Sequence, residues 1–205
     1  IEIIVNLDTN QVTITDEGDG FHKANSKHPK TKKNVVRTAF EELHAGSNFA
    51  DTSTNILGTH GVGASIVNIL SKYFSVTTVN STSYVHYAWN DFKVIEEDNR
   101  GKTPKDKKGT SISFIPSPEV FPGFKWDEEL ISTYLSFKQF LLDLDPALKG
   151  LKLSAKYLRG TQSFDIGLTK TFIPVSYTHL RAHETPEHLV CRLLLEKKKK
   201  KHTQK

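Results

Sequence analysis

The sequence predicts an α+β domain, a two-layer sandwich in which helices cover one face of a mixed, mainly antiparallel sheet. Short segments with alternating apolar and polar residues recur along the chain and indicate strands. Between them lie three longer segments whose apolar residues have helical spacing. Strands and helices do not alternate strictly, so a layer of helices on a mixed sheet fits better than a regular βαβ arrangement.

The first predicted elements are a hairpin and a capped helix. Glu2–Asn6 and Gln11–Thr15 alternate apolar and polar residues around a short polar turn, which predicts two paired strands. A polar, lysine-rich loop follows from His22 to Lys33. We interpret its lysines as a solvated face, with contact to DNA as the alternative. Asn34 then provides a helix cap, and helical spacing continues to about Gly46.

The remaining elements are a second helix, a run of strands and a third helix. The glycine-rich segment Gly58–Gly63 precedes apolar residues whose helical spacing continues to Phe74. The segment Asp98–Gly109 is predicted as a charged turn, and Asp127–Leu144 as an amphipathic helix. The predicted strands are Ser75–Asn80, Ser83–Trp89, Lys93–Glu96, Thr110–Ile115 and Leu151–Leu158.

The composition of the chain is uneven. Val175–Lys205 holds 8 of the 28 Lys and Arg residues and 3 of the 23 Asp and Glu residues, which leaves 20 of each in residues 1–174. The only cysteine, Cys191, also lies there, so residues 1–174 contain neither a disulfide nor a thiolate metal site. No stretch approaches the ~18 apolar residues of a membrane helix. The chain contains no methionine, so we expect it to begin within a longer protein.

The C-terminal segment is interpreted as an artefact. Residues 175–185, VSYTHLRAHET, and 189–200, LVCRLLLEKKKK, resemble in their codons the two parts of a transposase-type sequencing adapter, in the right order. The alternative is a basic arm for nucleic acid, since the lysine run 197–201 would suit phosphates. We favour the first interpretation and predict that residues 1–174 form the domain, while residues 175–205 are disordered and contribute nothing to the fold.

Two glycine-containing segments are candidate ligand sites. Asp16-Glu17-Gly18-Asp19-Gly20 follows a predicted strand, where glycines allow a sharp turn and the close approach of a flat ligand. A carboxylate fixed there can accept a hydrogen bond from an exocyclic amine such as that of adenine, although an acidic turn is the simpler interpretation of this segment alone. Gly58–Gly63 opens a helix, where free backbone N–H groups suit phosphates. It is neither a dinucleotide fingerprint nor a P-loop.

Taken together, these segments resemble the ATP-binding domain of type II DNA topoisomerases, which has the GHKL ATPase fold shared by gyrase B subunits, MutL proteins, heat-shock chaperones and histidine kinases. The motifs that carry the resemblance are LHAGSNF (43–49), LGTHGVGASIVNILSKYF (57–74) and KGTSISFIPSPEVF (108–121). The triplet Ser47-Asn48-Phe49 is most similar to the large subunit of T-even-like phage topoisomerases. The resemblance covers essentially all of residues 1–174 and implies a GHKL domain truncated at both ends.

The resemblance also implies roles for individual residues. Asp16 would bind the adenine amino group, with Thr110 beside it, at the floor of the largest pocket and facing the lid. Asp19 stands where the family usually has an arginine that pairs with a carboxylate at the pocket mouth. Asn48 stands where gyrases place a lysine on the phosphate side. The other implied ATP-binding residues are the wall residues Gly18, Gly20 and Phe21 and the lid residues Gly58, Thr59, His60, Gly61, Val62 and Gly63.

By the same resemblance, the parent protein is an ATP-hydrolysing type II topoisomerase in the cytoplasm of a bacterial or phage-infected cell. It would use ATP and Mg²⁺ to drive DNA strand passage as a homodimer with a cleavage domain or subunit, without a membrane. One alternative is another GHKL ATPase, a MutL-like repair protein or a chaperone; the glycine-phenylalanine-arginine-glycine lid of MutL is absent here. The other is a non-catalytic nucleic-acid-binding module built on the basic tail, which the neutral body does not support.

We predict that the chain as given does not hydrolyse ATP at a meaningful rate. The resemblance implies that the water-activating glutamate, the family's general base, and the Mg²⁺-binding asparagine lie upstream of Ile1. The γ-phosphate lysine would lie in the following transducer domain. Residues 1–174 would then contribute no catalytic or metal-binding residue, and general-base catalysis alone is worth about 10²–10⁴-fold.

A steady-state phosphate-release assay checks this prediction. Residues 1–174 should show background release only, and a longer chain that includes both missing segments should turn over. Robust release by residues 1–174 alone would mean that a base has been overlooked.

Overall fold

The computed structural model describes residues 1–43, 62–144, 148 and 150–168, which form an eight-stranded sheet with three helices. The helices are α1 (Val35–Glu41), α2 (Gly63–Ile69) and α3 (Glu128–Leu144). The strands are β1 (Glu2–Asn6), β2 (Gln11–Asp16), β3 (Ser71–Val79), β4 (Ser83–Asn90), β5 (Lys93–Gly101), β6 (Gly109–Pro116), β7 (Ser154–Arg159) and β8 (Gln162–Asp165). The predicted α+β class is confirmed. No helix of the described residues is long and apolar enough to cross a membrane.

The order of strands in the sheet is β5-β4-β3-β6-β2-β1-β7-β8. Neighbouring strands are antiparallel except for β1 and β7, which run parallel. The predicted hairpin forms, with Glu2 opposite Thr15 and Asn6 opposite Gln11. Strand β6 lies between β2 and β3, so it joins the N-terminal hairpin to the meander of β3, β4 and β5.

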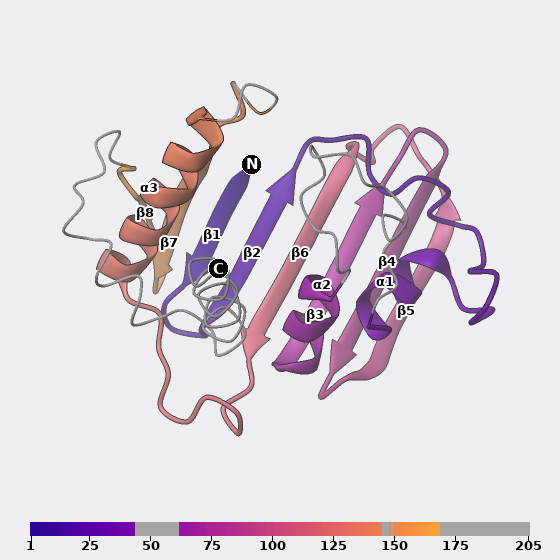
Figure 1. The fold of residues 1–205 in the computed structure, drawn as a ribbon, viewed down its shortest axis with the longest axis horizontal. Coiled ribbons are helices and arrows are strands. Elements are labelled where there is room, and N and C mark those ends of the chain that lie inside the picture. The colour runs from indigo at the N-terminus through magenta and orange to yellow at the C-terminus, as the bar shows by residue number, and fades with distance from the viewer. Residues whose placement is uncertain (44–61, 145–147, 149, 169–205) are drawn as a thin grey trace, which may run out of the picture.

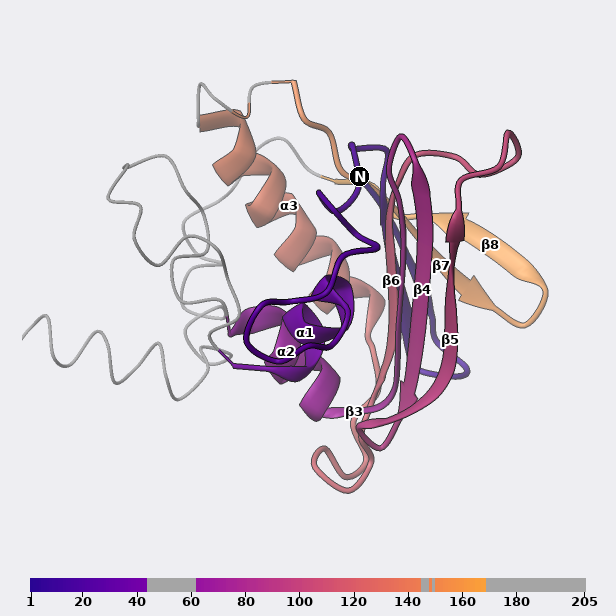
Figure 2. The ribbon, with the colours of Figure 1, turned by 90° about the vertical axis from the view of Figure 1, so that its right-hand side faces the viewer.

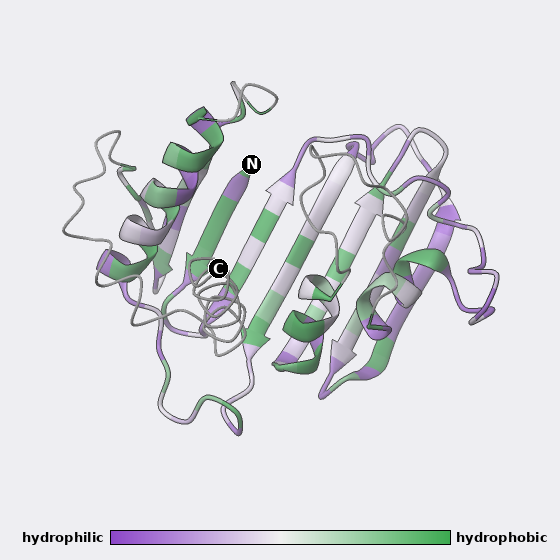
Figure 3. Ribbon diagram, in the orientation of Figure 1, coloured by the Kyte–Doolittle hydropathy of each residue, from purple (hydrophilic) through white to green (hydrophobic). Residues whose placement is uncertain are grey.

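The three helices lie on one face of the sheet, and no described helix covers the opposite face, which we call the open face (Figures 1 and 2). Hydroxyl side chains pair across strands on the open face, Thr15 with Ser111 at 3.0 Å between oxygens and Thr13 with Ser113. A sheet with one solvated face is expected to alternate apolar and polar residues. Figure 3 shows this alternation as bands along the central strands.

The core beneath the helices has two parts. The part beneath α1 consists of Ala24, Val36, Phe40, Phe74, Val76, Val85, Tyr87 and Trp89. The part that includes α3 consists of Ile3, Val5, Val12, Ile131, Leu135, Ala155 and Ile166. Phe114 of β6 packs against both parts. Each large apolar side chain buried in this way contributes about 1.5–3 kcal/mol to folding.

Several element boundaries differ from those predicted. Helix α2 ends at Ile69 rather than continuing to Phe74, because strand β3 already begins at Ser71. β-Branched and aromatic residues dominate β3, and its two partner strands supply the ladder of hydrogen bonds. Strand β5 continues through Asp98 to Gly101, where a charged turn was predicted, because β4 pairs along its whole length. Strand β8 was not predicted, and residues 175–205 lie outside the described part of the chain.

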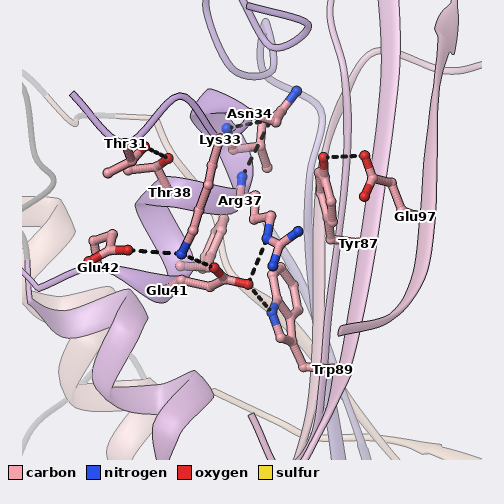
Figure 4. Close-up of polar contacts among 12 residues, drawn as sticks. Thr31, Lys33, Asn34, Arg37, Thr38, Glu41, Glu42, Tyr87, Trp89 and Glu97 are labelled. Carbon is pink, nitrogen blue, oxygen red and sulfur yellow. Dashed lines mark hydrogen bonds and ion pairs between the residues drawn. The ribbon is translucent and has the colours of Figure 1, made fainter. Parts of the chain in front are cut away.

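The carboxylate of Glu41 ties helix α1 to the sheet (Figure 4). Its oxygens accept hydrogen bonds from Lys33 Nζ at 2.8 Å, Arg37 Nε at 2.8 Å and Trp89 Nε1 at 3.0 Å. Burial alone would raise the pKa of the Glu41 carboxyl, but these hydrogen bonds outweigh it and hold the pKa below its ordinary value. Asn34 caps α1 as predicted, with its side chain accepting from backbone N–H groups of the first turn.

We predict that Glu41→Ala lowers the free energy of unfolding by about 1–3 kcal/mol, because it leaves the buried indole N–H of Trp89 without an acceptor and removes two ion pairs. Glu42→Ala is the matched control: Glu42 also accepts from Lys33, but its side chain is 43% exposed whereas that of Glu41 is 8% exposed. The control should change stability by less than about 0.5 kcal/mol. Urea denaturation measures both, and equal effects would show that Glu41 does not anchor α1.

The lowered pKa of Glu41 implies that the stability of the fold depends on pH. The pKa of Glu41 in the folded protein lies below the ordinary value of 4.5. Its stabilisation is therefore present above that value and is lost as the pH falls through the lower, folded-state pKa. Unfolding measured between about pH 6 and pH 3 should show a smaller loss of stability in Glu41→Gln than in the parent. An identical loss in both proteins would contradict the assignment.

Candidate nucleotide site

Three polar side chains meet near the ends of neighbouring strands and form what we name the polar row. Asp16 closes β2 and pairs in register with Thr110 of β6, which pairs with Thr78 of β3. The hydroxyl oxygens of Thr78 and Thr110 lie 3.2 Å apart. Val12 of β2 and Val76 of β3 are core residues an even number of positions away, so the row shares their face. The polar row therefore faces the helix layer.

One oxygen of the Asp16 carboxylate is already engaged. Oδ1 accepts a hydrogen bond from the backbone N–H of Gly18 at 2.8 Å, which closes a tight turn directly after β2. Within the described residues, Oδ2 has no hydrogen-bond partner. An ionised carboxylate can only accept hydrogen bonds. A ligand that meets Asp16 here must present a donor to it.

The loop after β2 is held against β3. Gly20 has a φ of +70°, and a Cβ atom at this position would lie 2.5 Å from the carbonyl oxygen of Val79. The backbone N–H of Phe21 donates to Thr78 Oγ1 at 2.9 Å. The Phe21 ring lies 5.9 Å from that of Phe40, measured between ring centroids. The predicted wall residues Gly20 and Phe21 therefore lie next to the polar row.

Thr78 and Asn80 belong to this site but were not predicted from the sequence. Thr78 is fully buried and connects Phe21 to Thr110. Asn80 Nδ2 donates to the carbonyl oxygen of Phe21 at 2.9 Å. Its Oδ1 accepts from the backbone N–H groups of Thr82 at 2.9 Å and Ser83 at 2.8 Å, which closes the turn between β3 and β4. Period-two alternation along β3 is the signal that identifies Thr78; Asn80 has no comparable signal.

Gly109 determines how closely β6 approaches the end of β2. Its φ is +134°, and a side chain at this position would overlap the carbonyl oxygen of Asp16. Glycine alone tolerates both conditions without strain. The glycine that precedes Thr110 is therefore required by the strand pairing that brings Thr110 beside Asp16.

Asp19 makes a salt bridge of its own. Lys108 Nζ donates to Asp19 Oδ1 at 2.7 Å and so connects the loop after β2 to the turn before β6. This hydrogen bond, together with the charge of Lys108, holds the pKa of the Asp19 carboxyl below its ordinary value. The side chain of Asp19 is 93% exposed, and exposed ion pairs contribute little to stability. Asp19 therefore forms a salt bridge with Lys108, at the position where the family resemblance predicts an arginine.

Two cavities are relevant here, one beside the loop after β2 and one at the opposite end of β6. One of about 770 Å³ is lined by Asp19, Gly20, Lys108 and the turn 80–83, together with residues of the loop 22–26. Asp16 and Thr110 do not line it, so the prediction that Asp16 forms the floor of the largest pocket does not hold for this cavity. The cavity is lined instead by the loop that follows β2 and by the turn between β3 and β4, together with Lys108.

The second cavity, of about 350 Å³, lies between α2, β6 and the segment that follows β6. Its lining residues are Ile66, Val67, Leu70, Ser71, Phe114, Pro116, Phe121, Phe124 and Trp126. Such an apolar lining does not suit the charged phosphates of a nucleotide.

Most of the predicted lid lies outside the described residues. Asn48, Gly58, Thr59, His60 and Gly61 fall within residues 44–61, which the structure does not describe. Val62 and Gly63 are described: Val62 precedes α2 and Gly63 is its first residue. Within the described part of the chain, no group of three or more His, Cys, Asp or Glu side chains is arranged to hold a metal ion.

The general-base glutamate is expected upstream of Ile1, which immediately precedes β1, the strand next to β2. The terminal ammonium group of Ile1 donates to the carbonyl oxygen of Lys152 at 2.9 Å, and its carbonyl oxygen accepts from the backbone N–H of Ser154. These contacts place Ile1 beside the start of β7, and the pairing of Glu2 with Thr15 puts Ile1 at the same end of the sheet as Asp16. The position of the general base upstream of Ile1 stays a prediction.

Curated relatives of the chain are subunits of DNA topoisomerases. The B subunit of DNA gyrase from Spiroplasma citri is 35% identical over 162 residues, which is 78% of this chain and 24% of the relative. The B subunit of DNA topoisomerase 4 from Mycoplasma pneumoniae is 36% identical over 135 residues, which is 64% of this chain and 21% of the relative. The chain thus spans about a quarter of the length of these relatives. No protein-family model matches it.

A solved structure has the same fold. The crystal structure of the 43K ATPase domain of Thermus thermophilus gyrase B in complex with an aminocoumarin matches with a TM-score of 0.59 and 26% sequence identity. The match covers 80% of this chain and 39% of that one. By sequence and by fold, the chain belongs to the ATPase domains of the type II DNA topoisomerases.

Proposed function

We propose that the chain is the adenine-binding part of an ATPase domain whose parent enzyme uses ATP to drive DNA strand passage. The polar row is the observation that carries this proposal. It aligns a carboxylate, one oxygen of which has no hydrogen-bond partner among the described residues, with two hydroxyl groups on strand ends that face the helix layer. The relatives, which are subunits of DNA gyrase and DNA topoisomerase 4, supply the reaction class.

In this proposal, adenine lies against the polar row. The exocyclic amino group of adenine is a donor and meets the acceptor-only Oδ2 of Asp16. The Thr110 hydroxyl lies in register beside it and can either donate or accept, directly or through water. Gly18, Gly20 and Phe21 form the wall that carries the base. Contacts of this kind select adenine by the pattern of its donors and acceptors.

The phosphate end of the nucleotide is assigned to residues 58–63 and to Asn48. Backbone N–H groups at the start of a helix suit phosphate oxygens, and Asn48 would add a neutral contact. The described residues hold no cluster of metal ligands. In this part of the site, phosphate oxygens and water would therefore coordinate Mg²⁺. Mg²⁺ commonly retains several waters in such complexes.

The wider assignment rests on the family resemblance rather than on this chain's geometry. The parent enzyme would act on DNA as a homodimer with a cleavage domain or cleavage subunit, in the cytoplasm of a bacterial or phage-infected cell. The relatives named above are B subunits of DNA gyrase and DNA topoisomerase 4 from bacteria, and the chain covers only part of each.

The proposal predicts that Asp16→Asn weakens ATP binding about tenfold to a hundredfold. The amide can present a donor where the adenine amine requires an acceptor, and losing a charge-assisted hydrogen bond costs about 1.5–3 kcal/mol. Titration calorimetry with ATP and Mg²⁺ measures the change. Denaturation of the same variant should be nearly unchanged, because Asp16 Oδ1 contacts only the backbone of Gly18 among the described residues.

Asp165→Asn is the matched control. Asp165 also ends a strand, β8, is exposed, and makes no side-chain hydrogen bond within the described residues. It carries the same change of charge and should bind ATP like the parent. If Asp16→Asn binds ATP as tightly as Asp165→Asn does, Asp16 is not the adenine anchor.

A further inference from the structure

Two lysine-rich segments meet at one end of the sheet. The loop 19–33 leads from β2 to α1, and the turn 101–109 leads from β5 to β6 (Figure 1). Asn25 Nδ2 donates to the carbonyl oxygen of Arg100 at 3.4 Å, and Lys108 pairs with Asp19 at 2.7 Å. Segments that are about 80 positions apart in the sequence therefore form one continuous surface.

This surface carries a strong local excess of positive charge. Residues 19–33 and 101–109 contain nine lysines and two aspartates, although residues 1–174 as a whole are balanced. Lys33 pairs with Glu41 and Glu42, and Lys108 pairs with Asp19. The other seven have no ion-pair partner within the described part of the chain, and we name them the lysine rim: Lys23, Lys27, Lys30, Lys32, Lys102, Lys105 and Lys107.

The turn that bears part of the lysine rim is held in one shape. Arg100 donates to both oxygens of Asp106, at 2.7 and 3.1 Å, and its guanidinium lies 3.9 Å from the centroid of the Tyr84 ring. Asp106 also accepts from the backbone N–H of Thr103 at 2.7 Å. These contacts lower the pKa of Asp106 and raise that of Arg100. The charges of the turn are therefore presented from an ordered backbone.

The chemistry of the lysine rim favours phosphates over other anionic partners. All residues of both segments are described, and none has an exposed large apolar side chain of the kind that enters a membrane surface. Neither segment contains arginine, the side chain best suited to bidentate recognition of a base edge or carboxylate. Lysines act as point charges, which position a nucleic-acid backbone without reading its sequence.

We propose that the lysine rim is a binding surface for the phosphate backbone of duplex DNA and that it adjoins the candidate nucleotide site. The surface is inferred from the geometry above, and the choice of DNA rests on the proposed function. Each phosphate contact contributes about 0.9 to the slope of log affinity against log salt concentration. DNA binding by the rim is therefore sequence-independent and falls steeply with salt.

The test compares two triple variants of the full chain with the same change of charge. Lys27, Lys105 and Lys107 are changed to Gln in the rim variant; Lys93, Lys125 and Lys152, which are exposed elsewhere on the fold, are changed to Gln in the control. Both variants keep the lysines of residues 197–201, whose contribution is then common to both. Fluorescence anisotropy with a mixed-sequence 20-base-pair duplex measures affinity from 50 to 200 mM KCl.

The rim variant should bind the duplex more weakly than the control, with a salt slope smaller by about 2 to 3. Equal affinities and slopes for the two variants would overturn the proposal. So would a rim variant that retains DNA binding but loses binding to phosphatidylserine vesicles. Calorimetry with ATP distinguishes failure of this proposal from failure of the proposed function. A parent chain that does not bind ATP would contradict that function. The difference in DNA binding between the rim variant and the control variant would be unaffected.

Discussion

The position of β6 between β2 and β3 is the constraint on which the candidate site depends. Its two antiparallel pairings set Asp16, Thr110 and Thr78 at the same level of the sheet. A shift of either pairing by one residue would turn the corresponding side chain to the open face. Gly109 makes the pairing possible at the end of β2, because any side chain there would overlap the Asp16 backbone.

The site is also joined to the core through aromatic contacts. The Phe21 ring lies against Phe40 of α1, and Phe40 lies 5.3 Å from Phe74 of β3 between ring centroids. Phe74 in turn contacts Trp89, whose indole N–H donates to Glu41. The loop that carries Gly18 and Gly20 is thus continuous with the most buried part of the domain. Close-packed interiors of this kind transmit displacement. We therefore expect that loss of the Glu41 hydrogen bonds also displaces the loop of the site.

Much of the fold follows from local patterns in the sequence. The hairpin, the Asn34 cap and the span of α3 all have strong local signals, and each formed nearly where predicted. The end of α2 did not, because residues from Ser71 onward gain more from pairing with β4 and β6 than from continuing a helix. Strand β8 is formed by its pairing with β7. A short stretch of sequence does not show which strands will pair, so β8 was not predicted.

The candidate site, too, was predicted only in part from the sequence. Asp16 and Thr110 were expected together from the family resemblance, and the register places them opposite each other. Thr78 and Asn80 were missed because their roles depend on which backbone groups the loop after β2 presents to β3. The lysine rim was interpreted as a solvated loop because its second half lies about 80 residues further along the chain, and only the fold brings the two together.

In the proposed function, Asp16 selects adenine through the exocyclic amino group. Inosine triphosphate differs from ATP in carrying a carbonyl oxygen, an acceptor, where ATP carries that amine. Calorimetry with each nucleotide should show that the parent chain binds ATP at least about tenfold more tightly, because two acceptors would face each other in the inosine complex. The ratio should fall toward one in Asp16→Asn. Equal binding of the two nucleotides by the parent chain would contradict the account.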